Sequence, residues 1–302
     1  MWEIWSVTEI LGVVLPLVVV TLAGLVPSRY EPDTPFLANQ RWRYRDFIIV
    51  FCVLSVSVFV PPARVLIRKE MLPSAIIAGS TALLIVVSVW GVVRRKQRRP
   101  WRALGFDPTT ALTNTLWSLR IGLGVVSGLA VLVILIRLGA AGTDASIISA
   151  PGRAVWQGQL GAFLAACIVA AVISPITEEL VFRGLAYGPL FRKFGAAGAA
   201  LGSAAIWSAG HYSGLSYSGL SKMAFLLVLG IGYATVYRRR ESLVPTVVFH
   251  ILGNTAGIFI RDRTLGILVP LAGVSAGLWI LTAVLFGVAS RRHMNAEDSG
   301  SA

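Results

Sequence analysis

The chain has 302 residues, of which 56% are hydrophobic and 14% are charged, and its mean hydropathy is +0.75. A soluble domain carries about 25% charged residues, so this composition excludes a soluble globular protein and makes a bilayer the solvent of the chain. The formal net charge is +13. Because the cations lie between apolar runs, membrane topology explains them, and no nucleic-acid partner is expected.

Uncharged runs of helical length recur along the whole chain. A transmembrane helix needs about 20 apolar residues, and none of the runs alternates with the period of two that marks a strand. We therefore predict an all-α fold, a polytopic transmembrane bundle of eight or nine helices. In chain order the expected spans are residues 10–28, 47–63, 71–93, 121–136, 154–177, 194–221, 223–237, 242–260 and 264–290.

The basic residues are distributed unequally between the loops that join these spans. Numbering the spans from an external N-terminus places 19 of the 27 Lys and Arg on one side of the membrane. Cytoplasmic loops carry such an excess, so we predict an outside N-terminus, an inside C-terminus and a location in the plasma membrane. The sequence shows no extramembrane domain, so the bundle, surrounded by membrane lipid, must carry most of the function.

Two adjacent carboxylates, Glu178 and Glu179, directly follow the apolar run 154–177. An ionisable group at membrane depth costs roughly 2.5–3.5 kcal/mol, so the pair indicates a functional site. On a helix Glu179 and Arg183 are four residues apart and can form an ion pair, whereas Glu178 points about 100° away. One glutamate is thus expected to be neutralised and the other to stay reactive. The alternative is that the helix ends here and both carboxylates reach cytosolic water.

Two of the three histidines also stand in apolar runs. His211 follows Trp207 by four residues and His250 precedes Asn254 by four, so each pair shares a helical face. A single intramembrane histidine is more often a packing residue, but two on separate spans favour a site. Counting about 1.5 Å per residue from the neighbouring basic turns places these groups and Glu178 at a similar depth, roughly 15–27 Å.

These residues resemble the motifs of the CPBP family of intramembrane proteases, also called the ABI family, which includes the CAAX prenyl proteases and bacteriocin-processing enzymes. The family's EExxxR motif is matched at Glu178, Glu179 and Arg183. Its HxxxN motif is matched at His250 and Asn254. Three ordered motifs on three spans are far more specific than any one of them alone.

The middle motif of the family, FxxxH, is matched at His211, with Trp207 where the family usually has phenylalanine. The change keeps an aromatic side chain at this position. The resemblance covers about residues 155–262, a third of the chain. We accordingly expect transmembrane helices of no assigned role over 1–153, a protease core over 154–262, a last transmembrane helix over 263–293 and a disordered tail over 294–302.

The resemblance implies an intramembrane endopeptidase that hydrolyses a peptide bond of a membrane-associated protein or peptide. Such a reaction needs a base that activates water, and we assign this role to Glu178, with His211 sharing the proton. His250 and Asn254 are expected to donate hydrogen bonds to the oxyanion. The residues expected to support the site are Glu179, Arg183 and Trp207.

A metal-dependent mechanism is the second interpretation of the same residues. Glu178, His211 and His250 would then hold a zinc ion that activates the water. The chain has no HExxH motif, and the three ligands would come from separate helices. The sequence therefore leaves zinc undecided, and no other cofactor is expected.

Two other classes of function fit part of the pattern. Paired acids and histidines in a helical bundle also form the proton relays of transporters, but the sequence shows no repeat and a carrier does not explain the spacing of His250 and Asn254. A catalytically silent relative that acts as a membrane scaffold or immunity factor would keep the fold alone. The presence of every motif residue argues against it.

Overall fold

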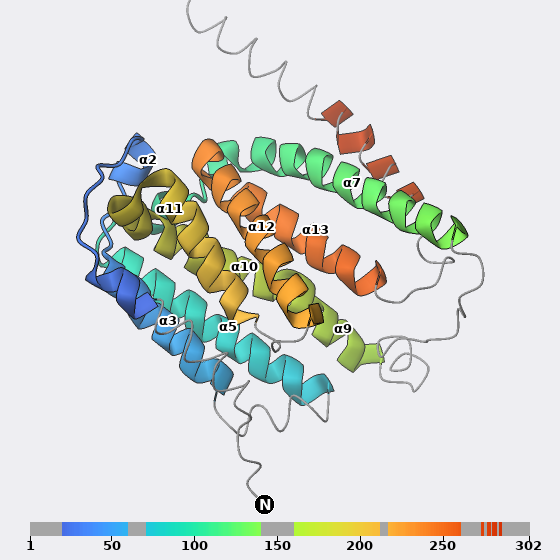
Figure 1. The fold of residues 1–302 in the computed structure, drawn as a ribbon, viewed down its shortest axis with the longest axis horizontal. Coiled ribbons are helices and arrows are strands. Elements are labelled where there is room, and N and C mark those ends of the chain that lie inside the picture. Colours follow the sequence, from blue (N-terminus) through green and yellow to red (C-terminus); the bar gives the residue numbers. More distant parts are fainter. Residues whose placement is uncertain are drawn as a thin grey trace, which may run out of the picture. The chain divides into compact units, whose positions relative to one another are not determined.

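The computed structural model describes residues 20–59, 71–139, 160–211 and 217–260, together with short stretches between 273 and 285. Over these residues the secondary structure is helical and contains no strand, so the predicted all-α class is confirmed there (Figure 1). Most of the predicted spans 10–28 and 264–290, and the predicted tail 294–302, lie outside the described residues.

Two helices in the described part are, by length and apolar composition alone, able to cross a membrane. They are Ile76–Arg94, within α5 (Met71–Arg94), and Gly219–Arg240, within α12 (Tyr217–Arg240). Both coincide with predicted spans. The total of eight or nine spans stays a prediction.

The chain folds into two compact units, each assembled from two separate stretches of sequence. Residues 1–106 and 176–243 form the first unit, and residues 107–175 and 244–302 form the second. The domain limits predicted at residues 153, 262 and 293 stay predictions.

Helix α11 (Tyr187–Gly210) is the central element of the first unit. It packs along α12 and against the π-helix η2 (Leu180–Ala186), while α3 (Tyr44–Phe59) packs against α5 and η2 (Figure 1). Aromatic side chains such as Trp42, Phe182 and Tyr237 fill the space between these helices and are buried. The described part of this unit also contains the short helices α2 (Pro35–Ala38) and α6 (Pro100–Leu104).

Helix α10 (Ser174–Glu179) carries the two adjacent glutamates and lies between two π-helical segments, η1 (Val169–Ile173) and η2. Pro175 has no N–H to donate, and in a regular α-helix its ring would crowd the carbonyl four residues earlier. The wider π turn before it relieves this conflict, so the helix continues through Pro175.

Helix α11 is interrupted at Gly195, whose φ of 70° and ψ of −173° are not helical. A positive φ is costly for residues that carry a Cβ, so glycine permits this sharp change of direction. The interruption follows the basic pair Arg192 and Lys193, where a turn between two spans is expected. Residues before and after Gly195 are therefore separate helical segments, and the second one presents Trp207 and His211.

The second unit is organised around α7 (Pro108–Gly139) and α13 (Val244–Ile260), which pack along each other. The rings of Trp117 and Phe249 meet across this interface with centroids 5.6 Å apart. Helix α13 also contacts η1, which continues from α9 (Leu160–Ile168). This unit carries His250 and Asn254.

Candidate active site

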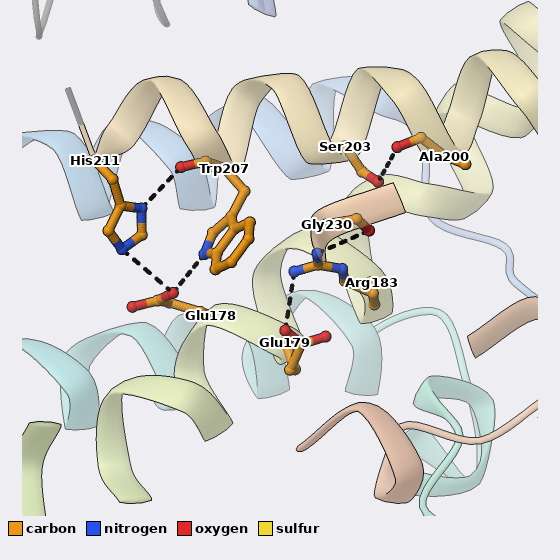
Figure 2. Close-up of polar contacts among 8 residues, drawn as sticks. All are labelled: Glu178, Glu179, Arg183, Ala200, Ser203, Trp207, His211 and Gly230. Carbon is orange, nitrogen blue, oxygen red and sulfur yellow. Dashed lines mark hydrogen bonds and ion pairs between the residues drawn. The ribbon is translucent and has the colours of Figure 1, made fainter. Parts of the chain in front are cut away.

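The structure brings Glu178, Trp207 and His211 together. Glu178, near the end of α10, faces the last turns of α11, where the indole Nε1 of Trp207 donates a hydrogen bond of 2.5 Å to Glu178 Oε2 (Figure 2). The Nε2 atom of His211 lies 3.9 Å from the same oxygen. The predicted proximity of Glu178 and His211 is therefore present, and the tryptophan lies beside both.

The imidazole of His211 is oriented by its own helix. Its Nδ1 atom lies 3.0 Å from the backbone carbonyl oxygen of Trp207. Because a carbonyl oxygen only accepts hydrogen bonds, Nδ1 must carry a proton and Nε2 is the atom that faces Glu178. In the neutral ring Nε2 presents a lone pair toward the carboxylate.

Glu179 and Arg183 form the predicted ion pair one helical turn apart. Arg183 Nη1 donates to Glu179 Oε1 at 2.9 Å, and Nη2 donates to the carbonyl oxygen of Gly230 on α12 at 3.1 Å (Figure 2). The Arg183 guanidinium also lies 5.0 Å from the centroid of the Trp207 ring and 5.4 Å from that of Tyr233. The pair thus connects the glutamate segment to α11 and α12.

The two glutamates differ sharply in their access to solvent. The side chains of Glu179 and Arg183 are 0% exposed, whereas those of Glu178 and His211 are 18% and 34% exposed. A substrate or water can reach Glu178 and His211 but not the ion pair behind them. The neutralised glutamate is therefore the buried one, and the reactivity of Glu178 stays a prediction.

Gly230 permits the close approach of α12 to α11 at this site. A Cβ atom at this position would lie 2.7 Å from the Ala204 Cβ and 3.1 Å from the Trp207 ring. Any larger residue would push the helices apart and move the carbonyl that accepts from Arg183. The glycine therefore helps to hold both the arginine and the tryptophan in place.

His250 and Asn254 are one turn apart on α13, in the second unit. His250 is buried, and the Nδ2 atom of Asn254 donates a 2.9 Å hydrogen bond to the carbonyl oxygen of Ala170 in η1. This bond fixes the Asn254 side chain against the segment that leads into α10. The oxyanion role predicted for His250 and Asn254 stays a prediction.

One contact of the site was missed by sequence reasoning, the hydrogen bond from Trp207 to Glu178. The sequence indicated only that an aromatic side chain replaces the usual phenylalanine. The signal that would have found the bond is the chemical difference between the two residues, because an indole carries an N–H donor and a phenyl ring carries none.

Zinc would require a set of ligands at about 2.0–2.2 Å from one point. The described residues contain no group of three or more His, Cys, Asp or Glu side chains arranged to bind a metal ion. Glu178 and His211 supply two donors, and the bond from His211 Nδ1 to a carbonyl is the outer contact that usually orients a zinc-bound histidine. Glu178 and His211 are two of the three residues of the predicted zinc set, which stays a prediction.

The structure thus places an accessible carboxylate and an imidazole beside a buried ion pair, an arrangement that suits general acid–base chemistry in an apolar helical chain. Residues 160–256, about a third of the chain, match the family described as Rce1-like, type II CAAX prenyl endopeptidase. This match supports a CPBP/CAAX intramembrane protease family for the chain, and that family indicates a peptidase and an integral membrane protein. No curated protein and no solved structure matches it significantly.

The matched segment contains every predicted site residue, from Glu178 to Asn254. A membrane-associated protein or peptide is the class of substrate that such a peptidase implies. The match favours the peptidase over the carrier.

Proposed function

We propose that the chain is an intramembrane endopeptidase in which Glu178 and His211 together activate the attacking water. The observation that carries the proposal is the separation of 3.9 Å between Glu178 Oε2 and His211 Nε2, on side chains that are both accessible. This distance is too long for a direct hydrogen bond but suits one water molecule that contacts both atoms. Both atoms accept hydrogen bonds, so a water would donate one proton to each and direct its lone pairs toward a substrate.

The chemical step follows from this arrangement. Glu178 takes a proton from the water while the water oxygen bonds to the carbonyl carbon of the scissile peptide. The tetrahedral intermediate then collapses, the carbon–nitrogen bond breaks, and the proton passes to the leaving amine. His211 holds the second water proton and keeps the nucleophile aligned. Glu179 and Arg183 support the backbone on which Glu178 stands.

We assign stabilisation of the oxyanion to His250 and Asn254. Their support is the order of the motifs along the chain and their spacing of one helical turn. Removing one such donor typically costs 10²–10³-fold in rate, or about 2.7–4 kcal/mol.

Asn254→Asp is expected to lower kcat by roughly 10²-fold, because the carboxylate keeps the shape of the amide but donates no hydrogen bond to the oxyanion or to the Ala170 carbonyl. KM is expected to change little, since the interaction is made mainly in the transition state. Steady-state cleavage of a membrane-anchored peptide by the purified protein in liposomes measures both constants. Thr255→Val, a nearly isosteric change at the next position, is the control, and equal kcat values for Asn254→Asp and the control would remove the oxyanion role.

The role of zinc can be settled separately. If the ion is bound, Glu178, His211 and His250 would hold it, and it would supply a Lewis acid for the water and the carbonyl. Elemental analysis of the purified full-length protein, together with its activity after dialysis against a chelator, distinguishes the two mechanisms. With zinc bound, Glu178 and His211 would act as ligands of the ion rather than as acceptors of the water protons.

Trp207→Phe tests whether the indole N–H positions Glu178. The variant keeps an aromatic ring against Arg183 but loses a hydrogen bond to a charged group, a contact that contributes about 1.5–3 kcal/mol. We expect kcat to fall about tenfold with KM unchanged, because Glu178 occupies its reactive orientation less often. Trp101→Phe, at a half-exposed tryptophan outside the site, should leave kcat as in the parent. An unchanged kcat in Trp207→Phe would show that the bond has no part in the reaction.

A further inference from the structure

A basic pocket opens on the first unit, away from the residues assigned to catalysis. It has a volume of about 400 Å³, and its lining includes four cations together with Ser28 and Tyr44. The four cations are Arg43, Arg45, Arg192 and Lys193. They come from the start of α3 and from the basic pair before Gly195, two segments that are far apart in the sequence. No carboxylate lines the pocket.

Two of the cations are held in place by backbone carbonyls. Arg192 donates to the carbonyl oxygens of Gln40 at 3.1 Å and Trp42 at 2.5 Å. Lys193 donates to the carbonyl oxygen of Gly24 at 3.0 Å and to that of Val26. Burial lowers the pKa of Lys193 below the ordinary value for lysine. Its charge is thus incompletely solvated, and a bound anion would stabilise it.

The other two cations, Arg43 and Arg45, are exposed and lie at the start of α3. Within the part of the chain that the structure describes, their guanidinium groups have no hydrogen-bond or ion-pair partner. The nearest carboxylate in sequence, Asp46, accepts from the Arg43 backbone N–H at 2.6 Å and pairs with Lys96 at 2.5 Å. Asp46 is therefore occupied, and two guanidinium groups remain available beside two fixed charges.

Apolar side chains are exposed on the same elements. Residues 20–26 run along the start of α3, where the hydroxyl of Tyr44 donates to the Val20 carbonyl at 2.7 Å. From these two elements Leu22, Leu25 and Ile49 project with exposed fractions of 59%, 77% and 56%. Exposed apolar side chains beside a cluster of cations suit an amphiphile with a negative head and hydrocarbon chains, rather than a small soluble anion.

We propose that the basic pocket binds the phosphate of an anionic phospholipid headgroup. Arg43 and Arg45 would donate hydrogen bonds to the phosphate oxygens, with Arg192 and Lys193 supplying fixed positive charge. The acyl chains would lie along the exposed leucine and isoleucine side chains. The site is independent of the catalytic assignment, because none of its residues takes part in that chemistry.

The test is a titration of the full-length protein in a neutral detergent with dioctanoyl phosphatidylglycerol, followed by thermal unfolding. We expect saturable stabilisation, with an apparent affinity that is roughly 25-fold weaker in Arg43→Gln/Arg45→Gln, or about fivefold for each arginine. The control Arg95→Gln/Arg98→Gln removes the same charge from two exposed arginines outside the pocket and should stay within about twofold of the parent. Arg43→Lys/Arg45→Lys should retain most of the affinity.

Three outcomes would overturn the proposal. If the affinity for the lipid fell equally in Arg43→Gln/Arg45→Gln and in Arg95→Gln/Arg98→Gln, the lipid would respond only to net surface charge. Equal stabilisation by the zwitterionic dioctanoyl phosphatidylcholine would remove the requirement for an anionic headgroup. Binding of inorganic phosphate as tight as that of the lipid would assign the pocket to a soluble anion instead.

Discussion

Glu178→Gln is expected to reduce cleavage of a membrane-anchored peptide by about 10²–10⁴-fold, the usual contribution of a general base. The amide keeps the shape of the side chain, and its oxygen can still accept from the Trp207 indole, so the fold should be preserved. It cannot take a proton from water, so the chemical step fails. Purified protein reconstituted in liposomes with a membrane-anchored peptide library, analysed by mass spectrometry, measures the loss.

Glu31→Gln is the matched control for this experiment, because it makes the same change at an exposed loop glutamate of the same unit. It should cleave as the parent does. Cleavage by Glu178→Gln that matched this control would remove Glu178 from the mechanism. If Glu178→Gln is inactive but folded, it becomes a trap, and proteins that co-purify with it would identify the substrate.

The second large effect is expected on stability, at the buried ion pair. Arg183→Met leaves the Glu179 carboxylate buried without its partner, a change that destabilises a protein by about 3–5 kcal/mol. Glu179→Gln/Arg183→Met removes both charges and should be clearly more stable than Arg183→Met alone. The midpoint of thermal unfolding in detergent measures each variant, and the full cycle with Glu179→Gln gives the coupling between the two residues.

Arg239→Met, at an exposed arginine on α12, provides the comparison for this pair and is expected to change the unfolding midpoint little. If Arg183→Met were as stable as Arg239→Met, the ion pair would not support the site. Arg183→Met could lose a larger fraction of its activity than the fraction of the protein that is unfolded. Such a result would show that the ion pair also positions Glu178.

Much of the first unit's site follows from sequence spacing. A separation of four residues predicts the pairing of Glu179 with Arg183 and the shared face of Trp207 and His211, because helical geometry alone brings such residues together. The contact from Trp207 to Glu178 depends on side-chain orientation and on how closely two helices approach. Hydrophobic periodicity predicts neither the orientation of a side chain nor the distance between two helices. The close approach that Gly230 permits can be recognised only from the structure.

The π-helical segments around α10 were also beyond sequence reasoning. Pro175 indicates a disturbance, but a kink, a break and a wider turn relieve the same steric conflict, and the choice depends on tertiary packing. The spacing of His250 and Asn254 predicts a shared face of α13 but not the neighbour that this face meets. For that reason the oxyanion role of His250 and Asn254 is supported by motif order and spacing, and the Asn254→Asp variant tests it.

The Trp207 side chain contacts the surroundings of both adjacent glutamates. Its N–H bonds Glu178, and its ring face lies against the guanidinium that neutralises Glu179 (Figure 2). The indole thus contacts the partly exposed carboxylate through its N–H and the buried ion pair through its ring. One side chain therefore links the surroundings of the two glutamates, and a substitution at Trp207 is expected to be felt at both.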